Sequence, residues 1–270
     1  MIRVWLFLLA SAGLPAAGDT RPLAVFDNGL GRGILSIGEQ AELARKTGYS
    51  AVVFAGTAHI PEMRSALDRQ GLEFIGIYTG MNVSGPQPSF DPGLPEAIRQ
   101  LRGSGAMILF NVNGKNPDGD AIAVQTIQQV ADMAAESGLR VALYPHYGMY
   151  MARIEDALRL REKAGRKNIG VVFNLCHWLR SGDEANLQLR LRQAAPYLYL
   201  VLINGADHEG DWDRLIQPLD RGEFDVSAFL KALQGVAYRG PIGLQCYAIP
   251  GDREENLRRS MEAWKKLTNH

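Results

Sequence analysis

The chain has 270 residues, with 29 basic and 29 acidic side chains and only two cysteines. Because the basic residues are spread along the chain, neither a nucleic-acid surface nor a polybasic membrane patch is predicted. The length suits one domain, since a single α/β barrel typically needs about 250 residues. A small-molecule partner is therefore expected, and homo-oligomers are left open.

The first residues have the composition of a targeting segment. One positive charge at Arg3 precedes an apolar stretch over 4–9, and small residues follow up to Ala16, Ala17 and Gly18. This order is typical of a secretory signal peptide over residues 1–18, which predicts a secreted or periplasmic protein. The alternative is a buried amino-terminal strand. The apolar stretch is too short for a membrane-spanning helix, so no stable membrane insertion is expected after cleavage.

From residue 19 to residue 270, short apolar runs alternate with longer stretches of helical spacing. The runs predict strands at 23–26, 51–54, 73–78, 107–110, 140–144, 170–173, 199–203 and 242–245. Helices are predicted at 38–46, from 118 or 120, at 153–164, from 225 and from 252. Strands alternating with helices indicate parallel βαβ units, and eight of them predict a single-domain (β/α)8 TIM barrel. Chemistry in such a barrel lies at the carboxyl ends of the strands.

Polar residues occupy those strand ends. They are Asp27, Asn111, Tyr144, His146, Asn174, His177, Asn204 and Gln245. The long connection over 205–224 carries Trp212 and is expected to form a lid or a substrate wall. Two imidazoles and several carboxamides favour a neutral, polyhydroxylated ligand over a phosphate. The alternative is that these side chains only satisfy backbone groups inside the barrel.

The second half of the chain, 141–267, resembles the xylose isomerase-like superfamily of TIM barrels, which includes sugar phosphate isomerases and epimerases. The similarity lies in the segments 141–146, 170–177, 220–225 and 238–245. The resemblance implies a carbohydrate-active isomerase or epimerase. It also implies a divalent metal held by acidic and histidine side chains at the strand ends.

At most of the implied metal-ligand positions this chain has other residues. Tyr144 and Gln245 stand where the family places glutamates, Asn174 replaces an aspartate, and Leu202 replaces a histidine. Amides are poor ligands for a hard cation, so a divalent metal is disfavoured. His146 and His177 stay as weak metal candidates, with Asp207 or His208 as further ligands.

The leading hypothesis is an exported sugar isomerase/epimerase-like enzyme. His146 or His177 would exchange a proton next to a carbonyl, because a carboxamide such as Gln245 cannot act as a general base. The expected substrate-binding residues are Tyr144, Asn174, Asn204, Gln245, Asp27, Asn111 and Trp212. The alternative is a non-catalytic carbohydrate-binding barrel. Cys176 and Cys246 are expected to stay unbridged, because a strand separates them.

Overall fold

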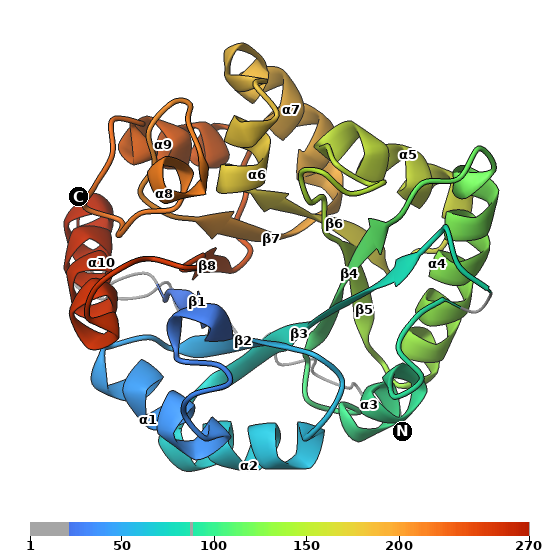
Figure 1. Cartoon of the computed structure of the whole chain (residues 1–270), viewed down its shortest axis with the longest axis horizontal. Coiled ribbons are helices and arrows are strands. Elements are labelled where there is room, and N and C mark those ends of the chain that lie inside the picture. Colours follow the sequence, from blue (N-terminus) through green and yellow to red (C-terminus); the bar gives the residue numbers. More distant parts are fainter. Residues whose placement is uncertain (1–21, 87–88, 270) are drawn as a thin grey trace, which may run out of the picture.

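The computed structural model describes residues 22–86 and 89–269, so the predicted signal peptide lies outside the described residues. Eight parallel strands form a closed barrel in chain order, ringed by helices (Figure 1). The predicted TIM barrel is thereby confirmed. The strands are β1 (Ala24–Phe26), β2 (Ala51–Ala55), β3 (Glu73–Asn82), β4 (Met107–Asn113), β5 (Arg140–Leu143), β6 (Ile169–Asn174), β7 (Leu198–Ile203) and β8 (Ile242–Leu244).

The helices of the described residues connect these strands. They are α1 (Ile37–Lys46), α2 (Ile60–Gln70), α3 (Leu94–Gln100), α4 (Gly119–Glu136), α5 (Ile154–Ala164), α6 (Leu175–Arg180), α7 (Leu187–Ala194), α8 (Trp212–Leu215), α9 (Val226–Gly235) and α10 (Arg253–Thr268). The local sequence explains where several of these helices begin. Ser36 and Glu39 form a capping box on α1, while Asp225 and Asp252 accept N–H bonds at the starts of α9 and α10.

The hydrophobic core has two parts. Alternate strand residues pack inside the barrel, including Phe26, Val172, Leu200 and Leu202. The outward residues pack against the helices in a larger cluster. This division follows from the period of two along each strand, which sends successive side chains to opposite faces. It also places Tyr144, directly after β5, in the inner cluster.

The ring closes between its first and last strands, which are also its shortest. Ala24 lies opposite Gly243, and Val25 lies opposite Leu244. β1 and β8 have three residues each. This seam joins residues more than 200 positions apart in the chain, so ring closure depends on contacts with a very large sequence separation.

Some element bounds differ from the prediction. β3 continues to Asn82 and β4 to Asn113, because the two strands stay paired along this stretch. Helix α6 starts directly after Asn174. The helices α2, α3, α6, α7 and α8 were not predicted from the sequence.

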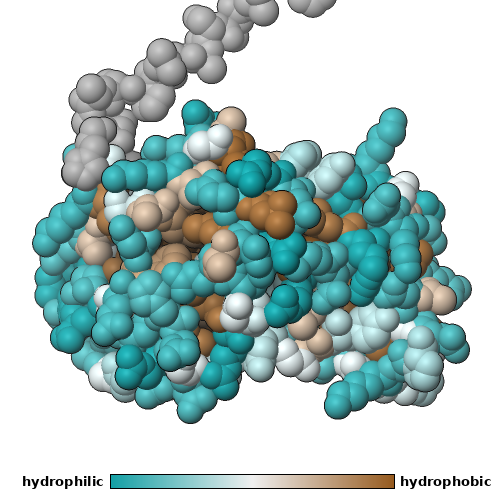
Figure 2. Space-filling view, turned by 90° about the horizontal axis from the view of Figure 1, so that it is seen from above, coloured by the Kyte–Doolittle hydropathy of each residue, from teal (hydrophilic) through white to brown (hydrophobic). Residues whose placement is uncertain are grey.

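Hydrophilic residues cover most of the face in Figure 2, with hydrophobic side chains visible between them. No helix in 22–86 or 89–269 has the length and apolarity of a membrane span. Cys176 and Cys246 are buried free thiols, as expected.

Candidate functional site

A cavity of about 500 Å³ lies at the carboxyl ends of the strands. Five of the predicted site residues line it: Tyr144, His146, His177, Trp212 and Gln245. The other lining residues are Phe26, Asn28, Arg32, Tyr78, Tyr147, Ile216 and Tyr247. This volume is within the range of small-molecule sites, and the lining combines aromatic rings with a few polar groups.

A hydrogen-bond network centred on Tyr144 forms the floor of this cavity. The hydroxyl of Tyr144 accepts from Nδ2 of Asn174 at 2.5 Å and from Nε2 of Gln245 at 3.4 Å. Oε1 of Gln245 accepts from Nδ2 of Asn28 at 2.5 Å and from the backbone N–H of Cys246 at 3.0 Å. Burial raises the pKa of Tyr144 well above its usual value, so the phenol keeps its proton. With two bonds accepted, its O–H is left to act as a donor toward a ligand.

Two imidazoles form one wall. The rings of His146 and His177 lie 3.9 Å apart between centroids and are tilted by 40°. Nδ1 of His146 is 3.0 Å from the carbonyl oxygen of Tyr147. Since a carbonyl only accepts, we assign the hydrogen to Nδ1, which makes Nε2 the basic nitrogen.

Burial keeps both imidazoles neutral. It lowers the pKa of His146. It lowers the pKa of His177 well below its usual value, and the nearby His146 adds to this effect. His177 is 5% exposed, and its Nδ1 has no hydrogen-bond partner among the described residues. A buried nitrogen of this kind is ready to bond to a ligand or a water molecule.

The connection after β7 supplies Trp212 and Ile216 to the cavity lining, beside the imidazoles, and its role as a lid or substrate wall stays a prediction. Its short helix α8 brings Trp212 to 5.4 Å from His177 and 6.1 Å from Tyr147, between ring centroids. Arg180, at the end of α6, fixes this segment by donating to the carbonyl oxygen of Gly210 and, at 3.0 Å, to Oδ1 of Asp211. Its guanidinium also lies 5.6 Å from the Tyr147 ring and 5.7 Å from that of Trp212.

Four predicted site residues do not line the cavity. Asn174 lies behind it and bonds to Tyr144. Oδ2 of Asp27 accepts from the N–H of Ala55 at 2.9 Å. Asn111 donates to the carbonyl of Thr79.

The fourth, Asn204, is fully buried. Its Nδ2 donates to the carbonyl oxygens of Gly205 and Leu215, both at 2.7 Å. Its side chain therefore braces the loop that carries Trp212 and does not line the cavity.

The cavity lining also contains Arg32, Asn28 and Tyr78, which were not among the predicted site residues. Tyr78 belongs to β3, where the prediction followed the apolar run, and burial raises its pKa to about 12. Asn28 directly follows the predicted strand end at Asp27, so its position was a usable signal. Arg32 comes from a glycine-rich loop that has no strand or helix periodicity.

The side chains do not fit the divalent metal that the family resemblance implies. The Tyr144 hydroxyl faces two N–H donors, and Oε1 of Gln245 already accepts two bonds. Leu202 is apolar and buried in the inner core. His208 pairs with Glu184 and lines a separate hollow with Asp207. No group of three His, Cys, Asp or Glu side chains suited to a metal exists within the described ranges.

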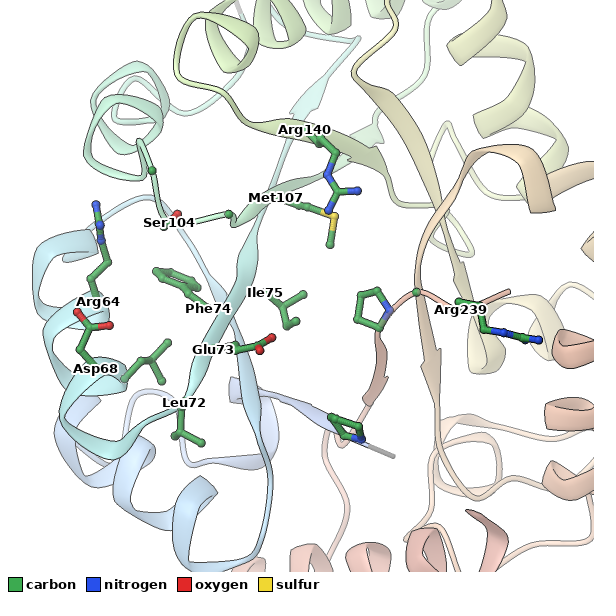
Figure 3. A pocket seen from close by; sticks show the side chains of 16 residues that line it. Arg64, Asp68, Leu72, Glu73, Phe74, Ile75, Ser104, Met107, Arg140 and Arg239 are labelled. Atoms are coloured by element: carbon green, nitrogen blue, oxygen red, sulfur yellow. The ribbon is translucent and has the colours of Figure 1, made fainter. Parts of the chain in front are cut away.

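A larger hollow, about 720 Å³, lies at the opposite end of the barrel (Figure 3). Figure 3 shows Glu73 and Arg140 there, at the starts of β3 and β5. Arg64 lines it too, but donates to the carbonyl oxygens of Gln100 and Arg102. Since active sites of TIM barrels lie at the carboxyl ends of the strands, we assign this hollow no catalytic role.

Comparison with known proteins agrees with the fold and with the predicted resemblance. A family model described as xylose isomerase-like TIM barrel matches residues 41–267, so the chain belongs to this family. No curated protein matches the chain significantly.

Solved structures show the same architecture. A D-allulose 3-epimerase from Methylomonas sp. is 18% identical, with 91% of this chain and 97% of that chain covered and a TM-score of 0.72. A 3-keto-D-glucoside 4-epimerase from E. coli is 17% identical over 85% and 94% of the two chains, with a TM-score of 0.71. A probable 3-DHS dehydratase from Bacillus anthracis is 12% identical over 90% and 98%, with a TM-score of 0.72. At these identities the similarity establishes the fold alone.

Proposed function

We propose that the protein is an exported enzyme of the sugar isomerase/epimerase type, which moves a proton on a carbon next to a carbohydrate carbonyl. The observation that carries this proposal is the neutral imidazole of His146, fixed through Nδ1, with Nε2 as its basic nitrogen at a cavity of sugar size. The sugar epimerases among the similar structures support the same class of substrate.

The reaction follows from the groups that line the cavity. Nε2 of His146 takes the proton from the carbon, and the electron pair moves onto the carbonyl oxygen to give an enediolate. The O–H of Tyr144 donates to that oxygen, in the manner of an oxyanion hole. Protonation of the same carbon by a water molecule on the opposite face gives an epimer, and His146 then releases its proton to solvent. For an isomer, the proton of the neighbouring hydroxyl moves to the enediolate oxygen, the new carbonyl forms there, and His146 returns its proton to the former carbonyl carbon. His177, which stacks on His146, keeps that ring in place.

Trp212 and Tyr147 provide flat surfaces for the apolar face of a sugar ring. The proposed mechanism uses no metal, because the donor atoms at the implied ligand positions do not fit one.

Deuterium exchange tests the proposal. The protein is incubated in D2O with a panel of ketoses and aldoses, and incorporation next to the carbonyl is followed by NMR. General base catalysis is worth about 10²- to 10⁴-fold, so His146→Gln is expected to lower the exchange rate by at least about a hundredfold. His208→Gln, in a separate hollow, is the matched control and leaves the rate unchanged.

Two further results decide the class of protein. Sugar binding by calorimetry without any exchange would identify a non-catalytic carbohydrate-binding barrel and reject the enzyme. Treatment with a chelator is expected to leave exchange unchanged, and a loss restored by one divalent metal would contradict the metal-free mechanism.

Export has its own test. Expression with the native amino terminus, followed by mass spectrometry of the exported fraction, is expected to give a chain that starts at Asp19. A full-length chain retained inside the cell would reject export without affecting the proposed chemistry.

A further inference from the structure

Arg32 is an unusual member of the cavity lining. It follows the short 3-10 helix Asp27–Gly29, in a loop where Gly31 and Gly33 have φ of +84° and +78°. Its side chain is 44% exposed and lies at the edge of the cavity. Within residues 22–86 and 89–269, its guanidinium has an ion pair with Asp27 but no hydrogen bond, although this group carries five N–H donors.

The only ion-pair partner of this guanidinium in the described chain does not bind it tightly. Nη1 of Arg32 lies 3.5 Å from Oδ1 of Asp27. Charge-assisted N–H···O bonds are typically about 2.7–2.9 Å long. Asp27 sits behind the lining, is 1% exposed and uses its other oxygen on the N–H of Ala55. Most donors of Arg32 therefore have no partner among the described residues.

The charge on the lining is unbalanced. Arg32 is its only formally charged side chain among the described residues, because His146 and His177 are held neutral and the others are amides, phenols or apolar groups. A neutral sugar would leave the guanidinium with water and with Asp27 at 3.5 Å. A negatively charged group on the ligand would take bonds that the protein does not offer.

We propose that the substrate is a sugar acid and that its carboxylate binds the guanidinium of Arg32. The proposal rests on the proposed carbohydrate function and makes Arg32 the residue that determines specificity. It departs from the neutral sugar expected from the sequence, because Arg32 was not among the predicted site residues.

A carboxylate fits better than a phosphate. One guanidinium forms a two-bond fork with one carboxylate, which matches a single negative charge. A phosphate group has up to two charges and is typically bound by several cations or by a helix amino terminus. The cavity lining offers neither a second cation nor a long helix that starts at it. The volume of about 500 Å³ accepts a single six-carbon acid.

The experiment compares three ligands with the same six-carbon skeleton: D-fructose, D-fructuronate and D-fructose 6-phosphate. Dissociation constants are measured by calorimetry for the full chain, for Arg32→Met and for Arg32→Lys. Because the guanidinium is partly exposed, we expect D-fructuronate to bind roughly tenfold more tightly than D-fructose, below the full value of a buried charged bond. Arg32→Met is expected to remove this preference, and Arg32→Lys to retain part of it.

Arg45→Met is the matched control, since it removes the same charge from the exposed surface of α1. It leaves the preference intact. Equal affinity for the acid and the neutral sugar, a preference that survives Arg32→Met, or tighter binding of the phosphate would each overturn the proposal.

The outcome can be separated from that of the proposed function. Arg32-dependent binding of D-fructuronate without deuterium exchange would reject the enzyme and keep the ligand class. Deuterium exchange on neutral sugars at a rate unchanged by Arg32→Met would keep the enzyme and reject the sugar acid as its substrate.

Discussion

Replacement of Tyr144 by phenylalanine tests the hydrogen-bond network at the floor of the cavity. The hydroxyl is buried, with the whole residue 1% exposed, and Asn174 is 4% exposed. Without the hydroxyl, one N–H of Asn174 loses its acceptor at 2.5 Å. The bond from Gln245 is long, at 3.4 Å, and contributes little.

The expected loss in the free energy of unfolding follows from that single N–H donor without an acceptor. A buried polar group left without a partner costs about 1–3 kcal/mol, so Tyr144→Phe is expected to lower the free energy of unfolding by roughly 2 kcal/mol. In a domain of this size the melting temperature then falls by roughly 4–8 °C. Urea unfolding followed by circular dichroism, together with calorimetry, measures both quantities.

Tyr247→Phe is the control for this prediction. Tyr247 lines the same cavity but is 55% exposed, so water replaces any bond of its hydroxyl and stability stays the same. Equal stability of Tyr144→Phe and the wild type would refute the reasoning, because it would mean that the Asn174 amide is satisfied without the phenol.

Three other outcomes are expected. In the folded protein the pKa of His177 is lowered, so around the usual histidine pKa near 6.5 the unfolded chain binds more protons than the folded one. The free energy of unfolding is therefore highest above that pH and falls as the pH drops to 5. His177→Gln is expected to weaken this pH dependence in urea titrations. Arg180→Met frees the segment that carries Trp212, so limited proteolysis is expected to cut near Gly210 faster than in the wild type, whereas an unchanged rate would show that Arg180 does not restrain it. Trp212→Ala is expected to weaken sugar binding roughly tenfold by calorimetry, and unchanged affinity would exclude stacking on this ring.

The sequence was sufficient for the architecture because buried strands and amphipathic helices leave strong periodic signals. It also predicted that one end of the barrel gathers several polar and aromatic side chains, since parallel strands end at the same face of a barrel. Five of these side chains line one cavity: Tyr144, His146, His177, Trp212 and Gln245. Their proposed roles stay predictions.

The path of the loops and the direction of the side chains at strand ends could not be predicted from the sequence. The carbonyls of Gly205 and Leu215 compete for the amide of Asn204 and turn it away from the cavity. Arg32 reaches the cavity because two glycines in its loop adopt positive φ, which leaves no periodic pattern. His177 was expected at a strand end, but α6 starts first and sets its direction.

The seam between β1 and β8 has a consequence for biosynthesis. The bond from Asn28 to Gln245 crosses it and spans 217 positions of the chain. Contacts between such distant positions form only after the intervening chain has been made, so the cavity floor is completed after β8 emerges from the ribosome. A chain cut short before β8 would keep both imidazoles and lack Gln245. Under the proposed function, we therefore expect ligand binding only in chains whose synthesis has reached the last strand.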